Sequence, residues 1–159
     1  MKRDENGDIV IGRQYQNHNT RPGPVYAGGG YTPMSNAIHE GVDAVARLLQ
    51  KFPDLVDDVS TGGARPLHVC GMSSRGERAT AYLIEQGADL EALDSYGYRP
   101  LHRMASNNLA LGAEALLKAG ADPNAETTSG QTALSIALQA DARNSAAVLK
   151  KYGGRDLIY

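Results

Sequence analysis

The sequence repeats itself with a period of about 33 residues, and this period restricts the folds open to the chain. Four short segments share a Thr or Arg followed by Pro or Ala, and they start at Thr32, Arg65, Arg99 and Thr132. These starts are 33, 34 and 33 positions apart. A separate series, Gly87, Gly120 and Gly153, keeps an interval of 33 residues. Two series with one period predict four similar structural units instead of a single central core.

Local signals predict two helices in each unit. Thr32 before Pro33 suits a helix start. The threonine hydroxyl can accept a hydrogen bond from an unpaired backbone N–H, and proline has no N–H that needs a partner. Pro66, Pro100 and Thr132 occupy corresponding places in the other units. A second helix is expected over residues 77–86, with Gly87 ending it, and Gly120 and Gly153 repeat that stop. Turn-forming residues at 94–97 and 127–130 predict projecting hairpins or loops between units.

The third unit carries the most telling segment, Leu116-Leu117-Lys118-Ala119-Gly120-Ala121-Asp122-Pro123-Asn124-Ala125. Together with the Pro-Leu-His starts at Pro66 and Pro100, this pattern resembles the ankyrin repeat family. The resemblance implies an all-α solenoid of four helix-turn-helix units over residues 31–156, with boundaries near 31–63, 64–96, 97–129 and 130–156.

This sequence departs from the family pattern at several places. Arg65 and Arg99 stand where the family has a capping threonine, and Ser35 and Ser135 stand where it has histidine. On cap chemistry alone, replacing either arginine by Thr is expected to raise the melting temperature, because Ser and Thr are favoured N-caps. The second unit is one residue longer than the third, so its inter-helix turn near residues 73–76 is expected to be distorted.

The two ends of the chain lie outside the repeats. Residues 1–30 show no helical period and are predicted to form an extended arm. We hypothesise that Ile9, Ile11, Tyr15 and Tyr26 cover the apolar side of the first unit, because the end units of a solenoid need covering. Residues 157–159 form a short apolar tail, which either covers the last helix pair or serves as a strand-addition ligand.

Composition argues against several protein classes. The 16 Lys and Arg against 18 Asp and Glu give a net charge of -2, which disfavours general nucleic-acid binding. No apolar run reaches the roughly 18 residues of a membrane span. The single cysteine, Cys70, excludes an intramolecular disulfide and fits a reducing compartment. We therefore expect a cytoplasmic protein, with the nucleus as the alternative, that binds neither nucleic acid nor membrane.

Candidate chemical groups favour structural roles. His68 and His102 hold the same repeat position, where the resemblance implies bonds to the backbone, and no metal-ligand spacing surrounds them. Cys70 is expected to fill the core, since nothing near it forms the arrangement of a base and an orienting group that activates a nucleophile. Asn124 matches an asparagine that oxygen-dependent hydroxylases modify in some ankyrin repeats, although its ordinary role is a hydrogen bond in the turn. We predict no enzyme activity, cofactor or metal.

The resemblance implies a protein-binding module. The family's variable positions fall on the loops and on the inner helices of this chain, and the predicted contact residues are Tyr31, Asn36, Ala64, Val69, Tyr96, Tyr98, Arg103, Ser106, Asn107, Ser129, Gln131, Ile136 and Gln139. Tyr96, Tyr98 and Arg103, with Arg65 and Arg99, are expected to cluster near the third loop. Tyr and Arg are enriched in binding hot spots, which favours a binding role for this cluster. A monomer that binds a protein partner is expected. The alternatives are a regulatory subunit that acts by self-association or within an assembly and, less favoured, an enzyme with an unrecognised site.

Overall fold

The computed structural model describes residues 32–156. Within them lie nine α-helices and no strand, which confirms the predicted all-α class. The helices are α2 (Pro33–Glu40), α3 (Val42–Lys51), α4 (Pro66–Cys70), α5 (Ser74–Glu77), α6 (Thr80–Glu85), α7 (Pro100–Ser106), α8 (Ala110–Lys118), α9 (Ala133–Gln139) and α10 (Arg143–Lys151). Two 3-10 turns cover Pro53–Asp57 and Thr61–Gly63. None of these helices is long and apolar enough to span a bilayer. The predicted arm and tail, Tyr31 included, fall outside the described residues.

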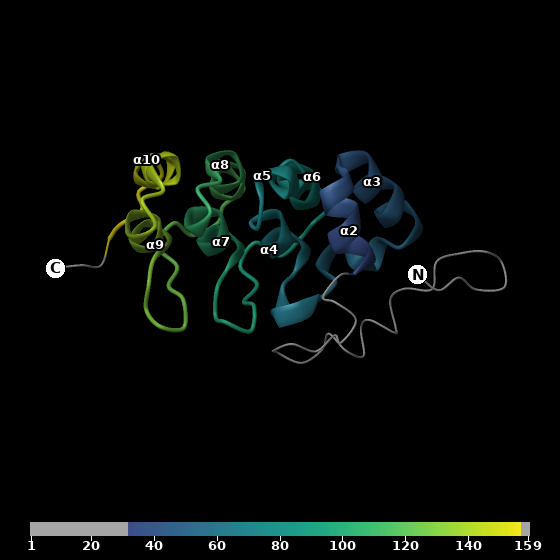
Figure 1. Cartoon of the computed structure of the whole chain (residues 1–159), viewed down its shortest axis with the longest axis horizontal. Helices are drawn as coiled ribbons and strands as arrows, with labels where there is room; N and C mark the ends of the chain where they lie inside the picture. Colours follow the sequence, from purple (N-terminus) through teal and green to yellow (C-terminus); the bar gives the residue numbers. More distant parts are fainter. Residues whose placement is uncertain (1–31, 157–159) are drawn as a thin grey trace.

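The helices pack in two rows (Figure 1). Helices α2, α4, α7 and α9 form the inner row, from which the loops project, and α3, α5, α6, α8 and α10 form the outer row. Each inner helix contacts the next one along the row, and α8 contacts both α6 and α10 in the outer row. Because neighbouring units cover one another in this way, the core runs as a continuous layer between the rows.

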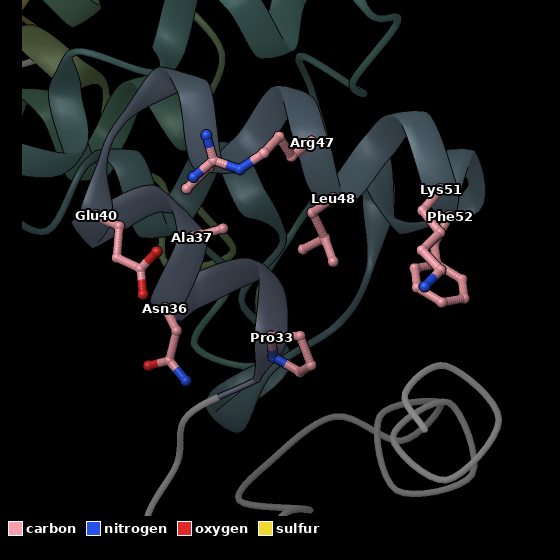
Figure 2. A pocket seen from close by; sticks show the side chains of 9 residues that line it. Pro33, Asn36, Ala37, Glu40, Arg47, Leu48, Lys51 and Phe52 are labelled. Carbon is pink, nitrogen blue, oxygen red and sulfur yellow. The ribbon is translucent and has the colours of Figure 1, made fainter. Parts of the chain in front are cut away.

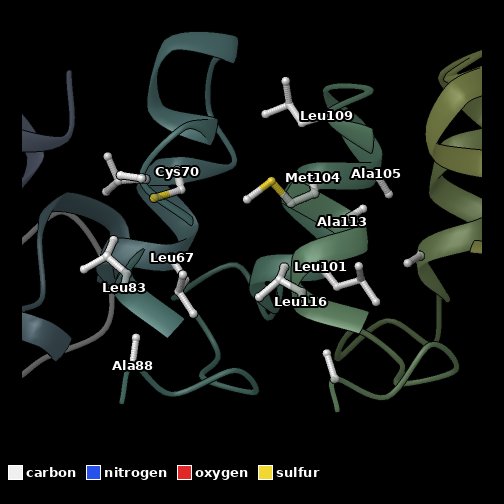
Figure 3. Close-up of a cluster of buried hydrophobic side chains, with 14 of the residues drawn as sticks. Leu67, Cys70, Leu83, Ala88, Leu101, Met104, Ala105, Leu109, Ala113 and Leu116 are labelled. Atoms are coloured by element: carbon white, nitrogen blue, oxygen red, sulfur yellow. The ribbon is translucent and has the colours of Figure 1, made fainter. Parts of the chain in front are cut away.

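One leucine from each outer helix anchors this core. Leu49 is 5% exposed, and Leu83, Leu116 and Leu149 are fully buried. Figure 3 shows Leu83 and Leu116 in one buried cluster with the inner-helix leucines Leu67 and Leu101. The buried leucine lies four residues before the terminal glycine in each of the last three units. The φ angles of Gly87, Gly120 and Gly153 are 91°, 107° and 86°, and these positive values explain why glycine recurs at this position. A left-handed residue can end each outer helix there.

The first and last inner helices begin as their threonines predict. The Thr32 side chain accepts from the Ser35 N–H at 3.2 Å, and the Ser35 hydroxyl accepts from the Thr32 N–H at 2.8 Å. The Thr132 side chain accepts from the Ser135 N–H, also at 3.2 Å. These bonds satisfy amides that a helix start leaves without an intrahelical partner.

The two central units use histidine at their helix starts. Nδ1 of His68 accepts from the Arg65 N–H at 3.0 Å, and Nδ1 of His102 accepts from the Arg99 N–H at 2.9 Å. Since Nδ1 accepts, Nε2 carries the proton, and it donates to the Tyr98 carbonyl from His68 at 2.8 Å. His102 donates likewise to the Ala125 carbonyl at 2.9 Å. Each histidine thus joins its own helix start to the segment that leads into the next inner helix, and burial lowers the pKa of both.

The outer helix of the second unit differs from the sequence prediction. The helix expected over residues 77–86 covers only α6, and a separate short helix, α5, precedes it, with Arg78 and Ala79 between the two. The extra residue of this unit is accommodated in the short α5, which contacts both α2 and α4. Gly76 allows this close approach, because a Cβ there would lie 3.3 Å from Cγ2 of Ile38 and 3.2 Å from the Val69 carbonyl oxygen.

Candidate functional site

Three loops project from the inner row, and we call them fingers 2, 3 and 4 after the units that follow them. They are residues 60–64, 94–98 and 127–131. Each is closed by a hydrogen bond from its first N–H to its last carbonyl, namely Ser60 to Ala64 at 2.8 Å, Asp94 to Tyr98 at 2.9 Å and Thr127 to Gln131 at 2.8 Å. The fourth residue of each finger is a glycine with φ between 71° and 86°. A positive φ at that place is what glycine permits without strain.

The fingers are also bonded side by side. The Ser95 N–H donates to the Gly62 carbonyl at 2.9 Å, and the Thr128 N–H donates to the Gly97 carbonyl at 3.2 Å. The Ser95 hydroxyl also donates to the Gly62 carbonyl. Together with the two histidine bonds, these contacts make the three fingers one continuous surface.

Finger 3 is organised around a buried carboxylate. The Asp94 side chain is 1% exposed. Its Oδ1 accepts from the N–H groups of Tyr96 and Tyr98 at 2.9 and 3.0 Å. Its Oδ2 accepts from Nε and Nη2 of Arg103, on α7, at 3.0 and 2.7 Å. A buried charge needs both a counter-charge and hydrogen bonds, and Asp94 has both.

Arg103 lies between this carboxylate and the two tyrosine rings. Its guanidinium carbon is 4.3 Å from the ring centre of Tyr98 and 5.7 Å from that of Tyr96. Both distances fall within the range of cation–π attraction. The Tyr96 ring, by contrast, remains largely in solvent, with 67% of the residue exposed. We call Asp94, Tyr96, Tyr98 and Arg103 the finger-3 cluster.

Arg65 and Arg99, which were expected in the same cluster, make other contacts. Nη1 of Arg65 donates to the Asp57 carbonyl at 2.7 Å, and Nη1 of Arg99 donates to the Glu91 carbonyl at 2.8 Å. In both cases the acceptor lies eight residues earlier in the chain. The two arginines therefore fasten each finger to the segment that leads into it, and Arg103 is the arginine that joins the tyrosines.

The other predicted contact residues occupy varied environments. Ala64, Val69 and Ile136 are buried, with exposures of 6%, 8% and 7%. Two are half-buried, namely Ser106 and Gln131. Four are exposed, namely Asn36, Asn107, Ser129 and Gln139.

Several of these side chains bond one another or nearby backbone. Nε2 of Gln131 donates to Oε1 of Gln139 at 3.2 Å, and Nδ2 of Asn107 donates to the Gly71 carbonyl at 2.7 Å. The hydroxyls of Ser129 and Thr127 lie 3.0 Å apart. Asn36 lies apart from these, beside a pocket on the first unit.

Asn124 joins the last two units. Its Nδ2 donates to the Gly153 carbonyl at 3.1 Å, and its Oδ1 accepts from the Arg155 N–H at 2.8 Å. Both ends of the amide therefore bond to the turn that follows α10.

Two further groups concern chemistry. Cys70 is fully buried, and burial raises the pKa of its thiol to about 12. Among residues 32–156, no three His, Cys, Asp or Glu side chains are grouped so that they could hold a metal ion.

Sequence reasoning missed Asp94 as the organising residue of finger 3. The segment from Asp94 to Gly97 was recognised as a turn, and an aspartate that bonds the amide two residues later is common turn chemistry. That signal could have identified the bond to the Tyr96 N–H. The contact with Arg103, nine residues away on a helix, has no comparable local signal.

Comparison with known proteins adds sequence relatives. A family model described as "Ankyrin repeats (many copies)" matches residues 83–137. The chain is 34% identical over 122 residues to ankyrin repeat and SOCS box protein 16 of Mus musculus, covering 71% of this chain and 27% of that protein. It is 33% identical over 96 residues to ankyrin repeat protein nuc-2 of Neurospora crassa, covering 59% of this chain and 9% of that protein. It is 38% identical over 84 residues to a Caenorhabditis elegans homologue of ankyrin repeat and LEM domain-containing protein 1, covering 49% of this chain and 12% of that protein. The chain thus spans about a quarter or less of the length of these relatives.

Proposed function

Because the chain belongs to the ankyrin repeat family, we propose that it is a non-catalytic interaction module that binds a protein partner through its fingers and concave surface. Ankyrin repeats are generally protein-interaction modules. Repeat solenoids offer extended surfaces for recognition. In this proposal the protein acts as a monomer in the cytoplasm, with the nucleus as the alternative compartment, and needs neither nucleic acid nor membrane.

The observation that carries the proposal is the finger-3 cluster. Tyr and Arg are over-represented among residues that dominate binding energy. Tyr96 is 67% exposed, and the neighbouring Arg103 is already held by Asp94 and by the Tyr98 ring. A partner that binds here would order few additional side chains, so little conformational entropy would be lost. We therefore place the centre of the binding surface at Tyr96.

Around this centre the exposed predicted residues supply the periphery. Asn107, Ser129 and Gln139 are exposed, and Gln131 is half-buried. Polar side chains at a rim suit the usual anatomy of an interface. Ala64, Val69 and Ile136 are each less than a tenth exposed, so we assign them no direct contact in this proposal.

The test is affinity capture of partners by wild type and by Tyr96→Ala, from a lysate of cells that express the protein. Tyr96→Ala is sharper than a change at Tyr98 or Arg103, because the Arg103 side chain binds the buried Asp94 and the Tyr98 ring packs against both Arg103 and the core. Leu111→Ala is the matched control, since Leu111 is 78% exposed on the outer helix α8. Circular dichroism and melting temperature should be unchanged for both variants.

We expect a captured protein whose yield falls in Tyr96→Ala and is retained in Leu111→Ala. Equal capture by all three proteins would remove finger 3 from the proposal and leave the binding function on another surface. Absence of any captured protein would weigh against the binding function itself.

A second candidate, self-association, is supported by Leu138. The residue is 45% exposed at the end of α9. Its counterparts five residues after the first residue of α2 and α7 are Ile38 and Ala105, and both are fully buried. Leu138 thus holds a position that faces a neighbouring unit elsewhere in the stack. Light scattering over a range of concentrations tests this candidate: a dimer lost in Leu138→Lys would support it, and a constant monomer mass would reject it.

A further inference from the structure

The first unit has a pocket that is lined by residues of this unit alone. Helices α2 and α3 line it, and its volume is about 250 Å³. Ala44, Leu48 and Phe52 supply an apolar floor, and Arg47 and Lys51 stand on the α3 side. Figure 2 shows Leu48 between the two helices and Glu40 on the α2 side.

This pocket belongs to a face that other units cover with a neighbour. Asn36, which lines the pocket, lies three positions after the first residue of α2, and its counterparts at that spacing in α4 and α9 are Val69 and Ile136. Val69 is 8% exposed and Ile136 is 7% exposed, whereas Asn36 is exposed. Within residues 32–156, the first unit has no unit before it to cover this face. A solenoid end of this kind requires a cap.

The segment that precedes the first unit has the composition to be that cap. Residues 4–11 read Asp-Glu-Asn-Gly-Asp-Ile-Val-Ile, three acidic residues followed by three consecutive apolar ones. The chain reaches Thr32 directly before Pro33, which itself lines the pocket. Twenty residues separate Ile11 from Thr32, and such a linker can extend by about 65 Å. Residues 4–11 can therefore reach any part of this face.

The charged side chains around the pocket indicate how an acidic segment would lie in it. Among residues 32–156, Arg47 makes no ion pair with a carboxylate. Arg47 and Lys51 are four residues apart on α3 and so lie on one side of that helix. Glu40 stands across the pocket on α2 and would repel an acidic segment. An acidic segment is therefore favoured along α3.

We propose that residues 4–11 of the same chain occupy this pocket, with Ile9 to Ile11 on Leu48 and Phe52 and the acidic residues toward Arg47 and Lys51. A tethered segment acts at a high effective concentration, which is of millimolar order for short flexible linkers. This favours the chain's own segment over the same segment of a second copy.

The experiment places a nitroxide label beside the segment in the full chain and measures amide signals by NMR. Gly12→Cys puts the label next to residues 4–11 without replacing any of them. Cys70 is fully buried with a raised thiol pKa, so the added cysteine is labelled selectively. We expect loss of the amide signals of Leu48 and Phe52 and no loss at Ala146, in the fourth unit.

Charge reversal then tests the proposed contact. Arg47→Glu should restore the Leu48 and Phe52 signals, because it places a like charge against the acidic segment. Arg143→Glu is the matched control: Arg143 is also an exposed arginine on an outer helix, but it lies in the fourth unit. The control should leave the signal loss unchanged.

The opposing results are distinct. Full signals at Leu48 and Phe52 in the labelled wild type would overturn the proposal. Signal loss that persists unchanged in Arg47→Glu would overturn the assigned charge contact. A further sample mixes nitroxide-labelled chain without ¹⁵N and ¹⁵N-enriched chain without the label. Loss of the same signals from the ¹⁵N-enriched chain would identify a second copy as the occupant and would also overturn the proposal.

Discussion

Asp94 and Arg103 form the most buried ion pair described in residues 32–156. Oδ2 of Asp94 lies 2.7 Å from Nη2 of Arg103, with 1% of the aspartate side chain and 20% of the arginine side chain exposed. Removing the arginine would leave a buried carboxylate without its counter-charge. We expect Arg103→Ala to lower the free energy of unfolding by about 3 kcal/mol, measured by urea denaturation.

Arg143→Ala is the control for this change. Arg143 pairs with Asp141 at 3.2 Å, but their side chains are 85% and 79% exposed. Solvent screening makes such pairs worth no more than about 1 kcal/mol. Similar losses in the two variants would contradict the role given to Asp94.

The arginines at the central helix starts reverse the expectation from cap chemistry. A threonine at position 65 would supply an N-cap acceptor worth about 1 kcal/mol. It would remove the charged hydrogen bond from Arg65 to the Asp57 carbonyl, and bonds to charged groups contribute about 1.5 to 3 kcal/mol. We therefore expect Arg65→Thr to lower the melting temperature, as measured by calorimetry, and Arg99→Thr to do the same through Glu91. A rise in both variants would show that the cap acceptor dominates.

Asp58 should make the protein less stable as the pH rises. Its side chain is buried, Oδ2 has no hydrogen-bond partner within the described residues, and burial raises the pKa of its carboxyl from 3.8 to about 6. The folded state thus favours the protonated form, whose stabilising effect is complete below pH 3.8 and is lost as the pH passes 6. We expect Asp58→Asn to be more stable than wild type at pH 7, by up to about 3 kcal/mol, and to lose this advantage near pH 4.

Urea denaturation of both proteins from pH 4 to pH 7 measures that difference. A difference independent of pH would mean that the Asp58 carboxyl does not titrate in this range.

The two buried histidines have the opposite effect to Asp58 and make the protein less stable as the pH falls. Burial lowers the pKa of His68 and of His102 below 6.5, so these side chains bind protons more weakly in the folded protein than in the unfolded chain. Their stabilising effect is complete above pH 6.5 and is lost as the pH falls below it. In the Asp58→Asn variant, where that carboxyl is absent, we expect the free energy of unfolding to fall below pH 6.5, by up to about 1.4 kcal/mol per pH unit for each histidine.

NMR of the imidazole nitrogens provides the direct check. At pH 6.5 each ring should be more than half neutral, with the proton on Nε2, because burial lowers the pKa of both and Nδ1 accepts a backbone N–H in each case. Rings that are mostly protonated at that pH would contradict the buried neutral pair.

Features that depend on a few adjacent residues could be predicted from the sequence. Thr32 before Pro33 predicted a helix start, and the structure has one there. The 33-residue interval of Gly87, Gly120 and Gly153 predicted helix ends, and each of these glycines has a positive φ. These signals are local, because capping and left-handed conformations depend on one or two residues.

Features that depend on packing between units could not be predicted in this way. Residues 74–85 form two helices, and the first of them packs closely on the preceding unit, where a Cβ at Gly76 would lie 3.3 Å from Cγ2 of Ile38. The partners of Arg65 and Arg99 lie eight residues back along a loop whose path the sequence does not reveal. The finger-3 cluster likewise required the approach of α7 to the loop before it, so that Arg103 could meet Asp94.

The half-exposed Leu138 also bears on how the molecule opens. In a stack of repeats each unit is stabilised by its own contacts and by those with its neighbours. At Leu138 the fourth unit lacks the covering that buries Ile38 and Ala105 in other units. Transient opening in the native state should therefore begin in α9 and α10, so their amide protons should exchange with solvent before those of α7.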